Sequence, residues 1–298
     1  MARHEQWGRR MNDEEEYGLV DTEATEEPGD EWEELDVSDT EADRVARKQD
    51  REFSAFRERI KDADQFKVEG GVFDEATLGA LYKLVQDGHI DAFGGPISTG
   101  KEAHVFLADA DGADVAVKIY RINASDFRQM RQYLEGDPRF RNIGSKKKKV
   151  VLAWTKKEFA NLRRAAAAGV NVPEPIAVER NVLVMEFVGH EGERAKRLGE
   201  VHVENPRTTY EVVREYTRRL YDAGLVHGDL SEYNIVVHDS QLWIIDLGQA
   251  VTIHHPNSRE FLERDCRNVA NFFARQGLDT DGEELLAHVT SEAAPRED

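Results

Sequence analysis

The sequence has no run of eighteen apolar residues and contains one cysteine, Cys266. Without such a run, a membrane-spanning helix is not expected. A lone cysteine excludes an intramolecular disulfide framework and a cysteine-based zinc cluster. The first ten residues are polar and charged, so they lack the apolar stretch of a secretory signal. These absences predict a cytoplasmic protein without a membrane partner.

Basic residues are few compared with acidic ones: 40 against 59, for a net charge of −19. The excess is concentrated in residues 1–52, which hold 19 acidic and 7 basic residues. Only 13 of the basic residues in the chain are lysines. This composition suits a high-salt cytoplasm, where screening weakens surface repulsion, and favours a halophilic source. An acidic tail on an ordinary mesophilic enzyme is the alternative.

The polar N-terminal part is predicted to contribute no sheet. Residues 1–50 hold too few apolar side chains to offset the entropy of ordering, so we expect a disordered acidic tail. Residues 51–95 are predicted to form the N-terminal helices of the folded domain. Apolar residues recur at helical spacing over 43–63 and again over 74–87.

From residue 96 onward, strands precede helices. The expected elements are strands at 104–108 and 115–120, a helix at 155–168, a strand at 182–187, a helix at 208–223, a hairpin of 235–237 with 242–245, and a final helix at 261–275. This order predicts a two-lobed α+β fold with a shared cleft. Residues 96–188 would form the N-lobe, interrupted by a flexible basic insert at 121–150, and residues 189–298 a helical C-lobe.

The strongest chemical signal is the stretch from His227 to Asn234, followed after a short hairpin by Asp246. Phosphoryl transfer needs a carboxylate that orients the acceptor and metal ions that neutralise developing charge. Asp229 would act as proton acceptor for the hydroxyl, and Asn234 and Asp246 would hold Mg²⁺ or Mn²⁺ through hard oxygen ligands. The competing interpretation is a chance loop, because Asp and Asn are common turn residues.

A lysine and a glutamate complete the expected phosphate site. Lys118 lies in the frame Val-Ala-Val-Lys of a predicted strand, which matches the lysine that contacts the α and β phosphates in kinases. Its partner should be a glutamate on a following helix, and Glu158 has the better helical context. Glu135 is the alternative, although Gly136 and Pro138 follow it and disfavour a sustained helix.

Two further segments are expected to bind ATP. Ser98, Thr99 and Gly100 precede the first predicted strand, where their hydroxyls and backbone amides would cover the phosphates. Glu186 and Val188 end a strand in the manner of an interlobe hinge, so their backbone groups would meet the adenine edge. An ordinary buried strand end is the alternative for the second segment.

Taken together, the segments 98–103, 227–234 and 245–251 resemble the Rio family of atypical protein kinases, and the match extends from about residue 70 to 290. The chain is most similar in pattern to archaeal members of the first Rio subfamily. The resemblance implies a truncated kinase fold that binds ATP and Mg²⁺, autophosphorylates on serine and acts in small-ribosomal-subunit maturation. It also implies that Asp246 accepts phosphate as an aspartyl intermediate during ATP hydrolysis.

The sequence departs from ordinary protein kinases at two points. Gly228 replaces the arginine of His-Arg-Asp, and the stretch after Asp246 contains no Ala-Pro-Glu. A short stretch without this motif is expected to lack an activation segment and a peptide-docking platform. Both departures favour an ATPase-like switch over broad kinase activity toward other proteins.

A basic cluster is predicted within the insert. Arg139, Arg141 and the run Lys146–Lys149 lie close together in an otherwise acidic chain. Such a cluster attracts phosphate, either of an RNA backbone or of ATP, unless it is simply a solvated loop. The family resemblance implies that Ser145, beside the lysines, is the autophosphorylated residue.

These features predict an ATP-dependent serine/threonine phosphotransferase and ATPase with no DNA partner. The resemblance to the Rio family implies that its partner is the pre-small-subunit ribosomal particle, both its protein and its rRNA. Two alternatives remain. A small-molecule phosphotransferase like the aminoglycoside kinases shares the pattern from His227 to Asn234, but not the segment 98–103. A ribosome assembly factor that holds ATP with little turnover would not need Lys118, Asp229 and Asp246 together.

Overall fold

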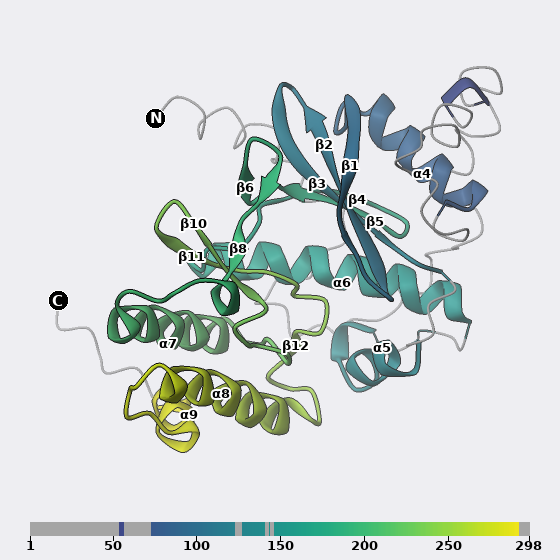
Figure 1. The fold of residues 1–298 in the computed structure, drawn as a ribbon. Coiled ribbons are helices and arrows are strands. Elements are labelled where there is room, and N and C mark those ends of the chain that lie inside the picture. The colour runs from purple at the N-terminus through teal and green to yellow at the C-terminus, as the bar shows by residue number, and fades with distance from the viewer. Residues whose placement is uncertain (1–53, 57–72, 123–126, 141–142, 144–145, 292–298) are drawn as a thin grey trace, which may run out of the picture.

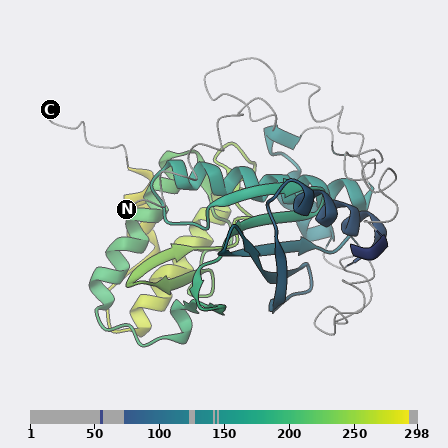
Figure 2. The same ribbon diagram turned by 90° about the horizontal axis from the view of Figure 1, so that it is seen from above.

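A computed structural model of the chain describes residues 54–56, 73–122, 127–140, 143 and 146–291. The chain folds into a sheet lobe and a helical lobe that lie side by side (Figures 1 and 2). The predicted acidic tail at 1–50, most of the predicted helix at 43–63, and Ser145 lie outside the described residues.

The sheet lobe is a five-stranded antiparallel sheet in the order β1-β2-β3-β5-β4. The strands are β1 (Ala92–Thr99), β2 (Ala103–Ala110), β3 (Ala113–Tyr120), β4 (Pro175–Glu179) and β5 (Val182–Glu186). The predicted strands at 104–108, 115–120 and 182–187 are thereby confirmed. The central strand β3 places Lys118 opposite Val105 on one side and Leu183 on the other.

Two helices cover the two faces of this sheet. Helix α4 (Glu75–Gln86) confirms the helix predicted at 74–87, and it begins where the Asp74 side chain accepts a hydrogen bond from the Thr77 amide at 2.7 Å. Its leucines pack with the side chains of Phe106 and Val117 on one face. Helix α6 (Lys147–Ala167) packs on the other face, where it shares a core with the C-lobe.

Strand β1 was not predicted, because Gly94, Gly95 and Pro96 are typical of a turn. The structure places all three inside the strand, with shifts in its register against β2 on either side of Pro96. β1 is an edge strand, where a residue without an amide proton is tolerated. The segment 98–103 therefore runs from the end of β1 to the start of β2 instead of preceding the first strand.

The predicted insert at 121–150 includes regular secondary structure. It contains helix α5 (Phe127–Leu134), the 3₁₀ turn η2 (Pro138–Phe140) and the first turn of α6. Helix α6 begins at Lys147 and not at Thr155, because the apolar residues after the lysine run are buried along its inner face.

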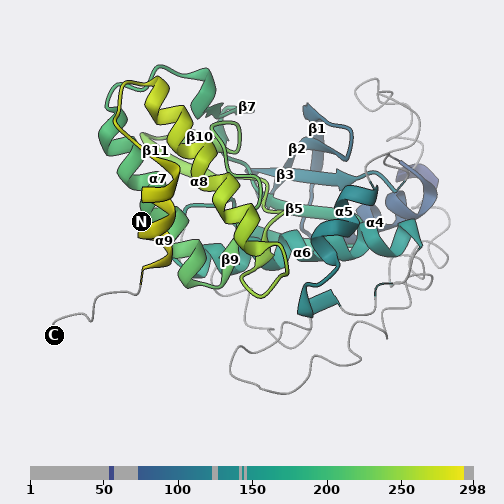
Figure 3. The same cartoon turned by 90° about the horizontal axis from the view of Figure 1, so that it is seen from below.

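The helical lobe holds the remaining elements. They are β6 (Gly189–His190), β7 (Glu193–Arg194), β8 (Lys196–Arg197), η3 (Leu198–Glu200), α7 (Pro206–Asp222), β9 (Leu225–Val226), β10 (Ile235–His238), β11 (Gln241–Ile244), β12 (Val251–Thr252), α8 (Ser258–Arg275) and α9 (Gly282–Thr290). Helices α7, α8 and α9 pack together around a core that includes Cys266 (Figure 3).

The predictions for this lobe hold with one exception. The helices expected at 208–223 and 261–275 correspond to α7 and α8, and the expected hairpin is β10 with β11. Helix α8 was expected to be the last element, but α9 follows it and packs on α7 and α8. None of the helices in the described part of the chain combines the length and hydropathy of a membrane span.

Candidate active site

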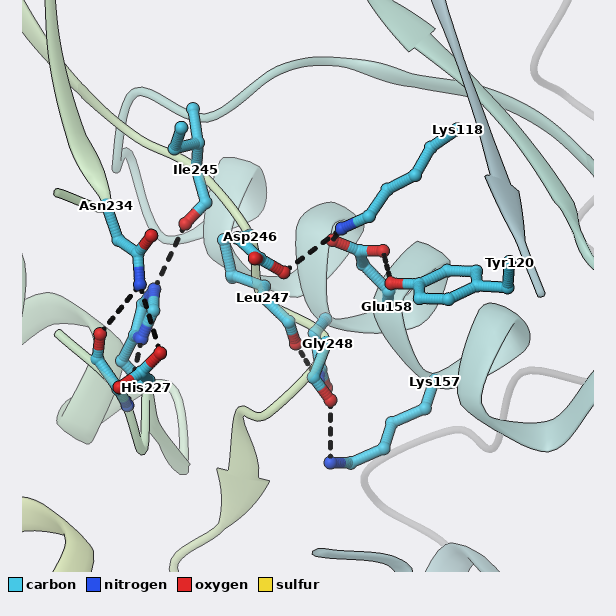
Figure 4. Close-up of polar contacts among 12 residues, drawn as sticks. Lys118, Tyr120, Lys157, Glu158, His227, Asn234, Ile245, Asp246, Leu247 and Gly248 are labelled. Carbon is cyan, nitrogen blue, oxygen red and sulfur yellow. Dashed lines mark hydrogen bonds and ion pairs between the residues drawn. The ribbon is translucent and has the colours of Figure 1, made fainter. Parts of the chain in front are cut away.

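The side chain of Lys118 connects the two lobes. Its Nζ lies 2.7 Å from Oε1 of Glu158 on α6 and 3.0 Å from Oδ1 of Asp246 in the C-lobe (Figure 4). The predicted ion pair between Lys118 and Glu158 is therefore present, while the alternative partner Glu135 pairs with Arg131. The Glu158 carboxylate is buried, whereas the Asp246 side chain is 54% exposed. Asp246 is thus the member of this group that an incoming ligand can reach.

The electrostatics favour a charged pair at this position. Lys118 loses solvation by burial, which lowers its pKa, but the carboxylates of Asp246 and Glu158 outweigh this effect and raise the pKa well above its ordinary value. The Lys118 ammonium in turn lowers the pKa of Asp246. Asp246 therefore stays ionised at neutral pH, as a metal ligand or a nucleophile requires.

The loop from His227 to Asn234 carries the predicted catalytic carboxylate. Asn234 Nδ2 donates to the Asp229 carbonyl oxygen at 2.8 Å and to its Oδ2 at 3.3 Å. Burial is the largest cause that raises the pKa of Asp229, and the negative charge of Asp246 raises it further. The His227 ring lies 3.2 Å from the carbonyl oxygen of Ile245, so it connects this loop to the residue before Asp246. The structure thus brings Asp229, Asn234 and Asp246 to one site, as predicted.

Asp246 has a left-handed backbone, with φ of 62°. A non-glycine residue in this region costs energy and persists only where its surroundings fix it. The turn also lets the amide of Gly248 donate to the Asp246 carboxylate, which contributes to its lowered pKa. A side chain at position 248 would come within 2.8 Å of Trp154 Nε1 and 3.1 Å of the Tyr120 hydroxyl, so the close approach requires glycine.

The donor set suits Mg²⁺. Among the described residues, no three His, Cys, Asp or Glu side chains gather into a group that could hold a metal. Mg²⁺ in nucleotide sites uses one or two carboxylates together with substrate phosphates and water. The Asp246 carboxylate would be one such ligand. Asn234 donates to Asp229 through its amide nitrogen, so its amide oxygen would be the second.

Sequence reasoning missed two residues on α8 that fix the catalytic loop. The carboxylate of Asp265 accepts hydrogen bonds from the amides of Gly228 at 2.7 Å and Leu230 at 2.9 Å, on either side of Asp229. Its neighbour Arg264 donates to the Gly228 carbonyl and to the Tyr133 hydroxyl. Burial raises the pKa of Asp265 to about 7, although both amides oppose the shift. Asp265 stands among the apolar residues of the buried face of α8, and a carboxylate at such a position was the available signal.

The predicted phosphate-covering segment forms the turn between β1 and β2. Ser98 and Thr99 end β1 opposite Val105 and His104. The amide of Gly100 donates to the Ala103 carbonyl at 2.9 Å, so it closes the turn and does not point toward a ligand. Of the three predicted residues, Ser98 and Thr99 therefore keep hydroxyls for phosphate contact.

The predicted hinge follows β5. The amide of Glu186 donates to the Glu174 carbonyl at 2.8 Å, and the carbonyl of Val188 accepts from the Ala195 amide at 2.9 Å. An adenine edge would therefore meet the opposite groups, the carbonyl of Glu186 and the amide of Val188. The geometry narrows the earlier prediction to these two atoms.

The basic cluster divides into two parts. Lys146–Lys149 surround the start of α6 on the surface. Arg139 instead turns inward, where the carboxylate of Asp137 accepts from its Nε at 3.0 Å and from Nη2 at 2.8 Å. Arg139 is therefore not part of a surface anion site, contrary to its predicted grouping. Arg141 lies outside the described residues.

Comparisons with known proteins agree with this geometry. The family model for the RIO domain matches residues 104–285. The RIO-type serine/threonine-protein kinase Rio1 of Haloferax volcanii is 71% identical over 279 residues, covering 93% of this chain and 96% of that protein. Rio1 of Methanocaldococcus jannaschii is 39% identical, with 77% of this chain and 79% of that protein covered.

Solved structures of the family share the fold. The Rio2 kinase from Chaetomium thermophilum in an ADP/Mg²⁺-phosphoaspartate complex superposes with a TM-score of 0.56 at 26% identity, covering 73% of this chain and 67% of that chain. The chain thus has a truncated protein-kinase-like fold. It belongs to the RIO kinase family, and its similarity to the Haloferax protein places it in the Rio1 subfamily and among haloarchaeal sequences.

Proposed function

We propose that the chain transfers the γ-phosphoryl group of ATP to serine or threonine hydroxyls, and that it also hydrolyses ATP, with Mg²⁺ as the required metal. The observation that carries this proposal is the position of Lys118 between Glu158 and Asp246. Lys118 would contact the α and β phosphates, and Asn234 and Asp246 would bind the metal that neutralises charge on the phosphates. The relatives named serine/threonine-protein kinases support the same activity.

In phosphotransfer to protein, Asp229 would orient the acceptor hydroxyl and take its proton as the oxygen attacks the γ-phosphorus. The bond from that phosphorus to the bridging oxygen breaks, and ADP leaves with the electron pair. The pKa of Asp229 is raised above that of an ordinary aspartate, so its carboxylate is a stronger base and better suited to accept a proton.

In hydrolysis, the ionised Asp246 would attack the γ-phosphorus in place of the hydroxyl. ADP leaves in the same way, and water then cleaves the acyl phosphate to give inorganic phosphate and free Asp246. Support comes from the exposed, ionised Asp246 carboxylate and from the phosphoaspartate complex of the Chaetomium thermophilum Rio2 kinase.

The proposed setting is maturation of the small ribosomal subunit, with the pre-small-subunit particle as partner. The surface lysines at 146–149 supply positive charge for an rRNA backbone. We further propose Ser145 as the autophosphorylated residue, since phosphate there would reduce the positive charge of that surface.

One assay tests the proposed chemistry. The protein is incubated with γ-labelled ATP and Mg²⁺, alone and then with pre-small-subunit particles, and the reaction is quenched in acid. We expect released phosphate, together with a protein label that is stable to acid and lost in base or hydroxylamine. Asp246→Ala should lack this labile label. A wild-type protein that turns over ATP without any such label would limit Asp246 to metal binding, and absence of any turnover would overturn the proposal.

A further inference from the structure

The turn that follows Asp246 is held by a buried amide on α6. Asn161 is fully buried, and its Nδ2 donates to the carbonyl of Leu247 at 2.9 Å and to that of Ala250 at 2.8 Å. An amide nitrogen carries two protons, so both are used on this one turn. Leu247 is bonded directly to Asp246, whose left-handed backbone needs such external contacts to persist.

The orientation of this amide is fixed from its other side. Asn161 Oδ1 accepts a hydrogen bond from Nη1 of Arg139 at 2.8 Å. Rotating the amide by half a turn would place its oxygen against two carbonyl oxygens and its nitrogen against a guanidinium. Arg139 thus selects the one orientation in which Asn161 donates to both carbonyls.

Arg139 is itself held by Asp137, which is 1% exposed and accepts from Arg139 at its backbone amide, Nε and Nη2. The guanidinium therefore bridges a buried carboxylate and the Asn161 amide. A second contact comes from the same helix: the amine of Lys157 donates to the carbonyl of Gly248 at 3.0 Å (Figure 4). Helix α6 thus donates hydrogen bonds to three carbonyls of the turn after Asp246, those of Leu247, Gly248 and Ala250.

We propose that Asn161 is a positioning residue for Asp246, and that Arg139 sets the orientation in which it acts. Asp137 and Arg139, at the η2 turn, are thereby connected to the turn after Asp246 through the side chain of Asn161. This inference rests on the proposed function, because it takes Asp246 as a ligand of the nucleotide-bound metal. Contacts that orient a metal ligand commonly change metal affinity when they are removed.

The test measures Mn²⁺ binding and not turnover. Free Mn²⁺ is followed by electron paramagnetic resonance as the full chain is titrated in the presence of a non-hydrolysable ATP analogue. Asn161→Leu keeps the volume but removes both donors, so its Mn²⁺ affinity should fall roughly 10- to 100-fold. Asn161→Asp should lose affinity similarly, because a carboxylate would face the two carbonyls. Arg139→Met should give a smaller loss in the same direction.

Asn181→Leu is the matched control. Asn181 is equally buried, and its Nδ2 donates to the Tyr120 carbonyl at 2.7 Å and to Thr77 Oγ1 at 3.0 Å, away from the turn after Asp246. It should lose thermal stability comparably to Asn161→Leu while keeping wild-type Mn²⁺ affinity. If circular dichroism shows that Asn161→Leu is unfolded, the Mn²⁺ affinity of Arg139→Met tests the proposal instead.

The outcomes distinguish the proposed function from the positioning role of Asn161. A wild-type chain that binds no Mn²⁺ with the analogue would overturn the proposed function and this inference with it. If the wild-type chain binds Mn²⁺ and the folded Asn161 and Arg139 variants bind it with the same affinity, only the positioning role would be overturned. An equal loss in Asn181→Leu would show that the effect is general destabilisation, and would overturn it too.

Discussion

The hydroxyl of Tyr120 donates a hydrogen bond to Oε2 of Glu158, while Oε1 of the same carboxylate accepts from Lys118 Nζ at 2.7 Å. Tyr120 and Lys118 stand two residues apart on β3, so their side chains leave the strand on the same face. The strand thus supplies both partners of the glutamate on α6.

Tyr120→Phe removes one of these partners without changing the shape of the ring. We expect the free energy of unfolding to fall by about 1.5–3 kcal/mol, the usual value for a hydrogen bond to a charged group. The apparent KM for ATP should rise, because Glu158 then holds Lys118 less firmly. Urea unfolding and steady-state kinetics measure the two effects. Tyr210→Phe, in the C-lobe beside Phe273, is the control and should leave the KM unchanged.

Asp229→Asn tests the proton acceptor. The amide has almost the same size but cannot take a proton, so turnover should fall by about 10²–10⁴-fold while nucleotide affinity is largely kept. Single-turnover phosphotransfer and equilibrium binding of an ATP analogue distinguish the two quantities. Asp239→Asn, on an exposed turn, provides the control. Full activity in Asp229→Asn would assign the proton transfer to another group.

Asp265 should make stability depend on pH. Burial raises the pKa of its carboxyl to about 7, from an ordinary value of 3.8. Between these two values the folded chain keeps a proton that the unfolded chain has lost, so the contribution of Asp265 to the free energy of unfolding decreases as pH rises. Asp265→Asn cannot titrate and should lack this part of the decline.

Urea unfolding of both proteins at pH 5 and pH 8, in constant salt, measures this difference. The variant should lose less stability between the two pH values than the wild-type chain does. Asp222→Asn, at an exposed ion pair with Arg218, should behave as wild type. Parallel curves for the wild-type chain and Asp265→Asn would show that Asp265 is ionised throughout the range.

Replacing Lys146–Lys149 with alanine should weaken binding to the pre-small-subunit particle and reduce its salt dependence, because fewer counterions are released from RNA. The affinity of the free protein for ATP should not change, since these lysines lie at the outer end of α6. Filter binding at several salt concentrations measures the first effect. The charge-matched control replaces Lys83, Arg207, Arg259 and Arg267. Normal particle binding with lost ATP affinity would assign the lysines to the nucleotide instead.

Ser145→Ala should remove most autophosphorylation and leave ATP hydrolysis intact, because Ser145 is not among the residues proposed to bind phosphate or metal. In the wild-type protein, phosphate on Ser145 adds about −1.5 to −2 charge beside the lysines, so it should also weaken particle binding. Phosphopeptide mapping identifies the labelled residue. Full labelling of Ser145→Ala at other positions would show that a different residue is the acceptor.

Residue type and spacing were sufficient to predict which side chains come together. Lys118, Asp229, Asn234 and Asp246 follow the patterns expected for phosphoryl transfer, and the helical context of Glu158 identified the lysine's partner. Elements were missed where local composition opposed the tertiary outcome. Gly94, Gly95 and Pro96 are typical of a turn, yet the register of β2 incorporates them into an edge strand.

The supporting contacts were missed for a different reason. Asp265 and Gly228 lie 37 positions apart, and no spacing rule connects them. Asn161 looked like one polar residue in a charged helix, and only the packed structure shows that it faces the turn after Asp246. Arg139 was grouped by charge with its lysine neighbours, whereas its carboxylate partner Asp137 draws it inward. Such contacts depend on how distant segments pack.

Glu158 and Asn161 are three residues apart on α6, so a rigid helix cannot move one without moving the other. A displacement of α6 away from the cleft would release the ammonium of Lys118 and the turn behind Asp246 in the same motion. The ion pair of Lys118 with Glu158 and the support of the turn after Asp246 would therefore weaken or strengthen together.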